Sequence, residues 1–346
     1  MRSPHFLTIA VRKPDNTILI RELHWKGISD RFPICKKPFL RGIVTLIESM
    51  TNGIEALSYS ANVAIANDPD AKKESTGSSK TSDGSPNSPK STNEEPQALS
   101  NLAIMGSIAF AFAMGMGLFV AAPHLVTLWL GKQGLFQSEV AHPAFHLIDG
   151  FFKVLFLVSY IFLIALMKDI KRVFQYHGAE HKSIYTFEQG EELTVENAKR
   201  HTTLHPRCGT SFLLFLLIIS ILVFSAFFPA LGVTKLSDNV ILHHLILIIM
   251  KIFLMLPIAG ISYEFIRLSS RHTDNLIFRI LIFPGLLLQK LTTREPTDDQ
   301  LEIALASLKR VLYLEKNPQS LSVKELEITS LAQINPVAAS VGEFLG

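Results

Sequence analysis

Two short polar segments of this 346-residue sequence carry residue types that bind metal ions. The first, YHGAEHKS, places His177 and His181 four residues apart, with Glu180 between them. Residues four apart lie on one face of a helix, so both imidazoles can contact one ion. The order H-x-x-E-H is that of the inverted zincins, in which the glutamate is a base or a partner of the ligands. This segment therefore predicts a metal site with Glu180 as its candidate catalytic residue.

The second segment, HTTLHPRCGTSF, offers His201, His205 and Cys208. His205 and Cys208 lie three residues apart with a proline between them, a spacing that suits two ligands on a tight loop. Mixed histidine and cysteine ligands favour Zn²⁺, although another divalent metal is compatible with them. We expect His205 and Cys208 to join the two histidines of the first segment. The competing interpretation is that these side chains only make hydrogen bonds that fix a loop.

The segments that must position these residues are strongly hydrophobic. Hydrophobic residues make up 48% of the chain, charged residues only 18%, and the mean hydropathy is +0.30, all typical of a membrane protein. A helix needs about 20 apolar residues to cross a bilayer. The sequence predicts four such spans, at about residues 101–130, 147–168, 211–233 and 240–264. A soluble protein would not need four apolar runs of this length for its core.

The distribution of lysine and arginine predicts the orientation of these spans. The loop 168–210 contains seven of these residues and residues 265–294, directly after the fourth span, contain five, whereas the other two loops contain one each. Basic residues concentrate in cytoplasmic loops, so both termini and loop 168–210 are predicted to be cytoplasmic. Both metal-binding segments then lie at the cytoplasmic ends of neighbouring spans, where they can meet at the membrane surface.

The remaining segments complete a mainly α membrane protein with about four transmembrane helices. Residues 1–66 predict a small α+β cytoplasmic segment: FLTIAVR and TILIREL form a β-hairpin around a Pro-Asp-Asn turn, and an amphipathic helix follows. That helix lies either on the membrane or against other cytoplasmic elements. Residues 67–99 are Ser- and Pro-rich and predict a disordered linker. Residues 276–291 predict an interfacial element, and residues 292–346 a capped cytoplasmic helix with a loosely packed tail.

Lys251 lies near the middle of the fourth span, where a charge is costly and usually faces protein or water. It either snorkels to the surface, pairs with Asp149 of the second span, or meets a carboxylate of a partner membrane protein. Five histidines towards the outer face are too dispersed along the sequence to predict a second site: His124, His142, His146, His243 and His244.

Composition also excludes two classes of protein. The formal net charge of +3 gives no reason to expect nucleic-acid binding, and two cysteines, Cys35 and Cys208, cannot build a disulfide scaffold. The lipid bilayer is the predicted partner, and no feature of the sequence predicts an oligomeric state.

Several of these segments together resemble the YqhQ-like family, bacterial membrane proteins of unknown function often described as predicted metal-dependent enzymes. The similar stretches are IAVRKPDNTI, KPFLRGIVTLIESMTNGIEALSYSAN, the blocks HGAEHK and HPRCGTSF, and FPGLLLQKLTTREPTDDQLEIALASLKRVL. The resemblance implies a bacterial inner membrane location. It also implies that the proposed metal site of the family includes His177, Glu180, His181, His205 and Cys208. Lys182 and Arg207 lie inside the same blocks and are candidate polar partners of that site.

The sequence thus leads to two functional hypotheses. In the first, the protein is a metal-dependent hydrolase: His177, His181 and one of His205 or Cys208 hold Zn²⁺, and Glu180 activates water. In the second, it is a non-enzymatic scaffold or accessory subunit that binds another membrane protein through the long loop and Lys251. A transporter is disfavoured, because the sequence shows no inverted repeat.

Overall fold

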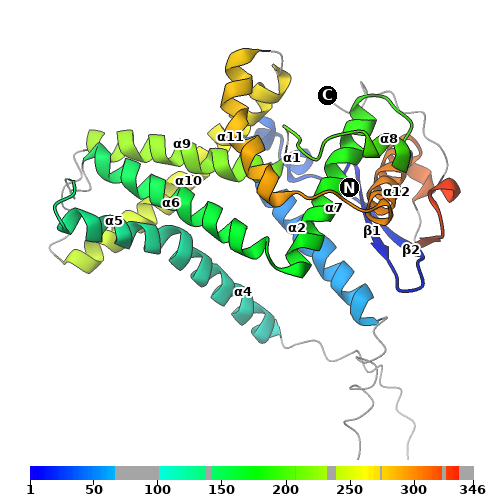
Figure 1. Ribbon diagram of the computed structural model, residues 1–346, viewed down its shortest axis with the longest axis horizontal. Coiled ribbons are helices and arrows are strands. Elements are labelled where there is room, and N and C mark those ends of the chain that lie inside the picture. The colour runs from blue at the N-terminus through cyan, green and yellow to red at the C-terminus, as the bar shows by residue number, and fades with distance from the viewer. Residues whose placement is uncertain are drawn as a thin grey trace, which may run out of the picture.

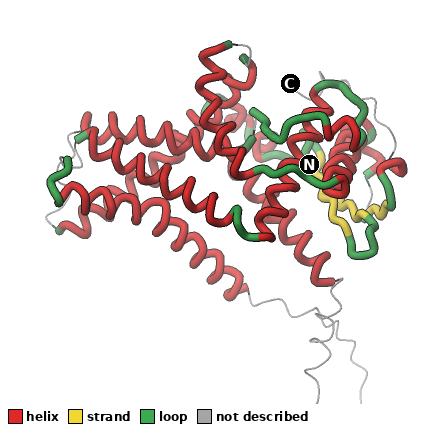
Figure 2. The backbone as a smooth tube through the Cα atoms, viewed as in Figure 1, coloured by secondary structure: helices red, strands yellow, loops and turns green. Residues whose placement is uncertain are grey.

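The computed structural model divides into a helical bundle at one end and a mixed unit of strands and helices at the other (Figure 1). Figure 2 shows that the strands are confined to the mixed end. The structure describes residues 1–66, 101–136, 142–206, 208–231, 239–272, 275–321 and 325–334. The predicted linker, 67–99, lies outside these residues.

The bundle contains four helical stretches that are long and apolar enough to cross a membrane, as predicted. They are Ala109–Lys132, Pro143–Ile164, Gly209–Ala230 and Ile241–Ser269. The first comprises the end of α4 (Asn101–Met116), a π-helical turn (Gly117–Ala121) and α5 (Ala122–Lys132). The others belong to α6 (Pro143–Ile164), α9 (Gly209–Ala230) and α10 (Val240–Arg271). We call α5, α6, α9 and α10 the membrane bundle.

Large apolar side chains fill the interior of the membrane bundle. Phe145 of α6, Phe224 and Phe228 of α9, and Leu247 and Ile258 of α10 form one buried cluster. Many other apolar side chains of the bundle are exposed, such as Leu125, Leu213 and Phe253. Such an arrangement is stable where lipid, rather than water, surrounds the helices.

The predicted hairpin is confirmed. Strands β1 (Phe6–Arg12) and β2 (Ile18–His24) pair antiparallel, and the first and last pairs are Phe6 with His24 and Arg12 with Ile18. In the turn between them Asn16 has a positive φ of 65°, a conformation that asparagine tolerates better than most residues.

The expectation of a loosely packed C-terminal tail was wrong for its first part. Residues Leu326–Ile328 form a third strand, β3, that pairs antiparallel with β2, and Ile328 is buried opposite Ile18. Two single 3₁₀ turns flank it, at Pro318–Ser320 and Leu331–Gln333. A strand of three residues is too short to show the alternation by which strands are recognised in a sequence.

Helix α12 (Asp298–Lys316) joins this sheet to the rest of the mixed unit. It begins with a capping box between Thr297 and Gln300, which confirms the predicted capped helix. Its two buried faces contact β1 and β2 on one side and α7 (Lys168–Glu188) on the other. Helix α8 (Val195–Lys199) packs nearby. We call the three strands together with α7, α8 and α12 the mixed unit.

Helix α2 (Leu40–Ala66) confirms the predicted amphipathic helix and packs against α10. It follows the short helix α1 (Ile28–Arg31) and a 3₁₀ turn (Pro33–Lys36). Arg41 of α2 donates hydrogen bonds to both carboxylate oxygens of Glu264 on α10. Other apolar side chains of α2, such as Met50 and Leu57, remain exposed. The helix therefore contacts the membrane bundle on one face and leaves an apolar face open.

Two further features place the candidate site. The helix that carries His177 and His181 is separate from the second span, because α6 ends at Ile164 and α7 begins at Lys168. Helix α11 (Leu276–Thr292) crosses α9 close to its start (Figure 1). Gly285 allows this crossing, since a Cβ there would lie 2.9 Å from Cβ of Ser211.

Candidate metal centre

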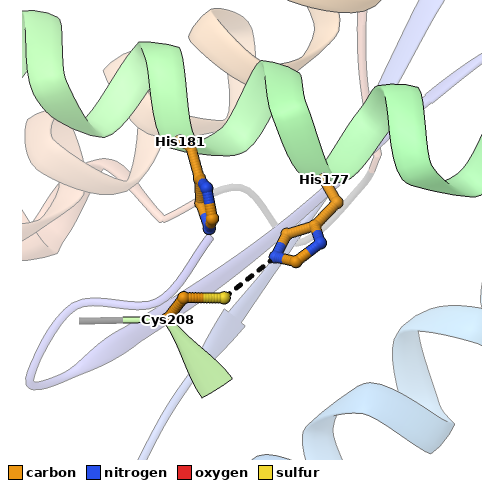
Figure 3. Close-up of side chains that lie close together, drawn as sticks. All are labelled: His177, His181 and Cys208. Atoms are coloured by element: carbon orange, nitrogen blue, oxygen red, sulfur yellow. Dashed lines mark hydrogen bonds between the residues drawn. The ribbon is translucent and has the colours of Figure 1, made fainter. Parts of the chain in front are cut away.

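Three of the predicted metal ligands converge where α7 meets the start of α9. His177 and His181 project from one face of α7 toward Cys208, which precedes the first residue of α9 (Figure 3). One potential ligand atom from each residue lies within 4.8 Å of the other two. Nε2 of His177 is 3.1 Å from Sγ of Cys208. We call these three residues the triad.

Hydrogen bonds to the backbone fix both imidazoles of the triad. Nδ1 of His177 is 2.8 Å from the carbonyl oxygen of Thr292, and Nδ1 of His181 is 2.5 Å from that of Thr203. A carbonyl can only accept, so each Nδ1 carries its proton. The lone pair of each neutral ring is then on Nε2. Metal-binding histidines are usually held by this kind of hydrogen bond.

The triad also provides a thiolate. Burial raises the pKa of the Cys208 thiol, but hydrogen bonds to His177 and His181 outweigh it and lower the pKa to about 5. Burial likewise lowers the pKa of His177, but its bonds to Cys208 and to the Thr292 carbonyl raise that pKa above its usual value. The metal-free site is therefore a thiolate next to a readily protonated imidazole. Cys208 also caps α9, accepting from the backbone N–H of Thr210, and a helix N-terminus favours negative charge.

This geometry fits a zinc ion. Zinc binds imidazole nitrogen at about 2.0–2.1 Å and thiolate sulfur at about 2.3 Å in a tetrahedron, which places the ligand atoms about 3–4 Å apart. The ligand atoms of the triad therefore need only small side-chain movements to reach one ion. A thiolate and two imidazoles oriented from behind are also the donor set that zinc prefers.

A titration of the thiolate tests the electrostatics of the triad. In metal-free protein, the absorbance of Cys208 thiolate at 240 nm should rise as the pH increases through about 5, rather than near the ordinary thiol value of 9.0. Cys208→Ser should remove this step. Cys35→Ser, which removes the other cysteine of the chain, should keep it. A Cys208 step near pH 9 would contradict the proposed contacts with the two histidines.

The loop that carries Cys208 is held by a buried glutamine of α11. Gln289 accepts from the backbone N–H of His205 (2.8 Å) and donates to the carbonyl of His205 (2.7 Å). It also donates to Oγ of Ser211 on α9 (2.6 Å). One side chain thus joins α11, the loop and α9, and keeps Cys208 in reach of α7.

The glycine of the H-G-A-E-H motif has a structural role. A Cβ on Gly178 would lie 2.1 Å from the carbonyl oxygen of Arg294, because the segment after α11 crosses α7 at this point. The carbonyl that orients His177 belongs to Thr292, the last residue of α11, two residues before Arg294. Close packing at Gly178 therefore positions a ligand of the triad.

Replacing this glycine tests the packing. Gly178→Ala should lower the free energy of unfolding by about 1–3 kcal/mol, because backbone atoms must move to admit the methyl group. Thermal unfolding of purified protein measures the change. Gly53→Ala is a matched control, since a Cβ at that helical glycine meets no atom within 4 Å. Equal stability of the two variants would contradict the contact with Arg294.

The other predicted site residues lie outside the triad. Glu180 is exposed on α7. His205 is buried beside His181, with ring centroids 5.7 Å apart, and its Nε2 is 3.2 Å from a carboxylate oxygen of Glu188. Lys182 pairs with Glu295 and donates to the carbonyl of Lys199. Arg207 lies outside the described residues.

Lys251 belongs to a second set of ionisable side chains, which is buried inside the membrane bundle. Its Nζ is 3.1 Å from Oδ2 of Asp149, and Nζ of Lys153 is 2.8 Å from the same oxygen. Lys251 therefore has a counter-ion within its own chain. Two of the dispersed histidines also meet here: Nε2 of His124 is 3.1 Å from Nδ1 of His244. We call Asp149, Lys153, Lys251 and His124 the buried cluster.

Sequence reasoning missed several groups that build the candidate site. Glu188 could have been found, because it lies two helical turns after His181 and thus on the same face of α7. Thr203 and Thr292 act through their backbone carbonyls. Every residue has such a group, so the residue type could not have predicted this role. Gln289 is an ordinary polar residue whose importance depends on its burial between α9 and α11.

Fold and site together define a multi-span membrane protein with a histidine–cysteine triad where the mixed unit meets the membrane bundle. The chain belongs to the family described as "Protein of unknown function (DUF1385)", which matches residues 37–314. It is 34% identical over 318 residues to the "Uncharacterized protein YqhQ" of Bacillus subtilis (strain 168), covering 90% of this chain and 88% of that protein. The resemblance to the YqhQ-like family is thereby confirmed. No solved structure matches the chain significantly.

Proposed function

We propose that this protein is a zinc-dependent hydrolase of a bacterial inner membrane, with its zinc held by His177, His181 and Cys208. The observation that carries the proposal is the pair of Nδ1–carbonyl hydrogen bonds, which leave the lone pairs of two Nε2 atoms available beside a single thiolate. Within the described part of the chain, no fourth histidine, cysteine or carboxylate joins the triad. Zinc with three protein ligands keeps one position for water or substrate and supplies Lewis acidity there.

A hydrolysis reaction also needs a group beside the triad that can accept and donate protons. His205 lies against His181, and Glu188 accepts a hydrogen bond from its Nε2. A carboxylate that holds an imidazole in place supports acid–base catalysis. We assign this role to the His205–Glu188 pair. Glu180 remains the base suggested by the motif, but its exposed side chain gives this assignment less support.

The cytoplasmic placement rests on charge. Loop 168–210, which holds both histidines of the triad, contains most of the lysines and arginines that lie between spans. The N-terminal hairpin, α12 and β3 gather at the same end of the bundle as this loop (Figure 1). One placement therefore accounts for the N-terminal hairpin, α12, β3 and the triad.

Cobalt substitution tests the site and its open position together. Protein loaded with Co²⁺ should show the visible bands of a tetrahedral site and a thiolate-to-cobalt charge-transfer band that Cys208→Ser removes. Added azide should shift the visible bands by occupying the open position. A spectrum that azide leaves unchanged would indicate a closed structural site and contradict the hydrolase. The His201→Ala control should behave as wild type, because His201 is hydrogen-bonded to Glu191 outside the triad.

A further inference from the structure

A pocket of about 620 Å³, lined largely by residues with polar or charged side chains, lies beside the triad but does not include it. Its walls come from the start of α7, the loop before Cys208 and the end of α11. Pockets of this size commonly bind small ligands or headgroups. The lining residues that the argument uses are Lys171, Thr203, Lys290, Thr293 and Arg294.

The charge of this pocket selects an anion. Lys171, Lys290 and Arg294 all line it, and none of the three makes an ion pair with another described residue. Its one carboxylate, Glu295, is already paired with Lys182. Three uncompensated cations around polar Thr hydroxyls match the charge and hydrogen-bonding needs of a phosphate group.

The location of the pocket points to a phosphate carried by a lipid. Lys171 lies seven residues after Ile164, where the second span ends, and Thr203 lies six residues before Gly209, where the third begins. The pocket is therefore at the height of the lipid headgroups. At that height, the negative surface potential of anionic lipids attracts lysine and arginine side chains, and each of them contributes a modest and similar amount of binding free energy.

One row of side chains on α11 leads from an apolar surface into this pocket. Ile280, Phe283 and Leu287 are spaced three and four residues apart, are 51–63% exposed, and thus form one row that faces outward. Lys290 continues the same row one turn later. A surface that changes from apolar to cationic within one turn suits an amphiphile with an anionic headgroup, whereas free phosphate needs no apolar neighbour.

We infer that this pocket binds the phosphate of an anionic phospholipid at the membrane surface. The inference goes beyond the proposed function and holds whether or not the triad binds zinc. Because Oγ1 of Thr293 lies 3.4 Å from Oγ1 of Thr203, whose carbonyl orients His181, the bound headgroup lies directly behind one ligand of the triad.

Native mass spectrometry of delipidated full-length protein in detergent tests this inference, with dioleoyl phosphatidylglycerol, dioleoyl phosphatidylcholine and inorganic phosphate as probes. Wild-type protein should bind one phosphatidylglycerol. Lys290→Ala/Arg294→Ala should bind it about 10- to 30-fold more weakly, since each cation contributes modestly to anionic lipid binding. Lys168→Ala/Arg172→Ala removes two exposed cations of α7 that do not line the pocket, and should bind as wild type.

Equal losses in both double variants would show only general surface attraction and overturn the inference. Equal binding of phosphatidylcholine would overturn the selection by charge, and displacement of the lipid by equimolar phosphate would assign the pocket to free phosphate instead. The same samples report zinc, which the Lys290→Ala/Arg294→Ala variant should retain. Failure of lipid binding is thereby distinguished from failure of the triad.

Discussion

Replacing Asp149 with leucine is expected to lower the free energy of unfolding by about 3–5 kcal/mol, because it leaves two buried lysines without a counter-ion. Asp149, Lys153 and Lys251 are 1%, 7% and 4% exposed, and the single oxygen Oδ2 accepts from both ammonium groups. Within the apolar interior of the membrane bundle neither lysine can reach water without moving a helix. The midpoint of thermal unfolding in detergent measures the effect.

Two control variants separate charge from packing in the buried cluster. Asp149→Asn keeps the shape of the side chain and should lose most of the same stability. The triple variant Asp149→Leu/Lys153→Leu/Lys251→Leu removes the unpaired charges together, so it should recover much of the stability that Asp149→Leu loses. A triple variant less stable than the single variant would contradict the ion-pair explanation.

The second large effect concerns zinc affinity. We expect His177→Ala, His181→Ala or Cys208→Ser to weaken zinc binding by about 100-fold or more. Each substitution removes one of only three protein ligands. Competition with a chromophoric chelator measures the affinity. His205→Ala is the informative neighbour: its Nε2 is hydrogen-bonded to Glu188, so we expect a much smaller loss.

The outcome for His205 decides between two arrangements. A loss as large as that of Cys208→Ser would make His205 a fourth ligand and the site closed, against the proposed open position. A small loss would support the proposed role of His205 as an acid or base beside the zinc. Unchanged affinity in all three triad variants would contradict the site itself.

Much of the fold could be predicted from the sequence, because long apolar runs and alternating strands depend on local patterns. The four spans, the hairpin and the capped helix α12 all follow from hydrophobic periodicity and capping residues. Strand β3 could not be predicted, since its three residues are defined by pairing with β2, which is distant in sequence. The break between α6 and α7 occurs without a proline or glycine to mark it.

The candidate site, like the fold, could be predicted from the sequence only in part. The spacing of four residues correctly placed His177 and His181 on one face of α7, and the expected proximity of Cys208 to them is also confirmed. Choosing between Cys208 and His205 as the third group required the path of the loop, which Gln289 fixes from α11. The contacts within the buried cluster could not be predicted, because they depend on how α5, α6 and α10 pack against one another and not on the sequence of any single helix.

The most direct measurement for the zinc site is elemental analysis by inductively coupled plasma mass spectrometry on detergent-purified protein. Wild-type protein and the His177→Ala/His181→Ala double variant would be compared after equal exposure to zinc and dialysis. We predict about one zinc per chain in the wild type and a near-complete loss in the double variant. Folded wild-type protein without zinc, or equal zinc in both proteins, would contradict the account.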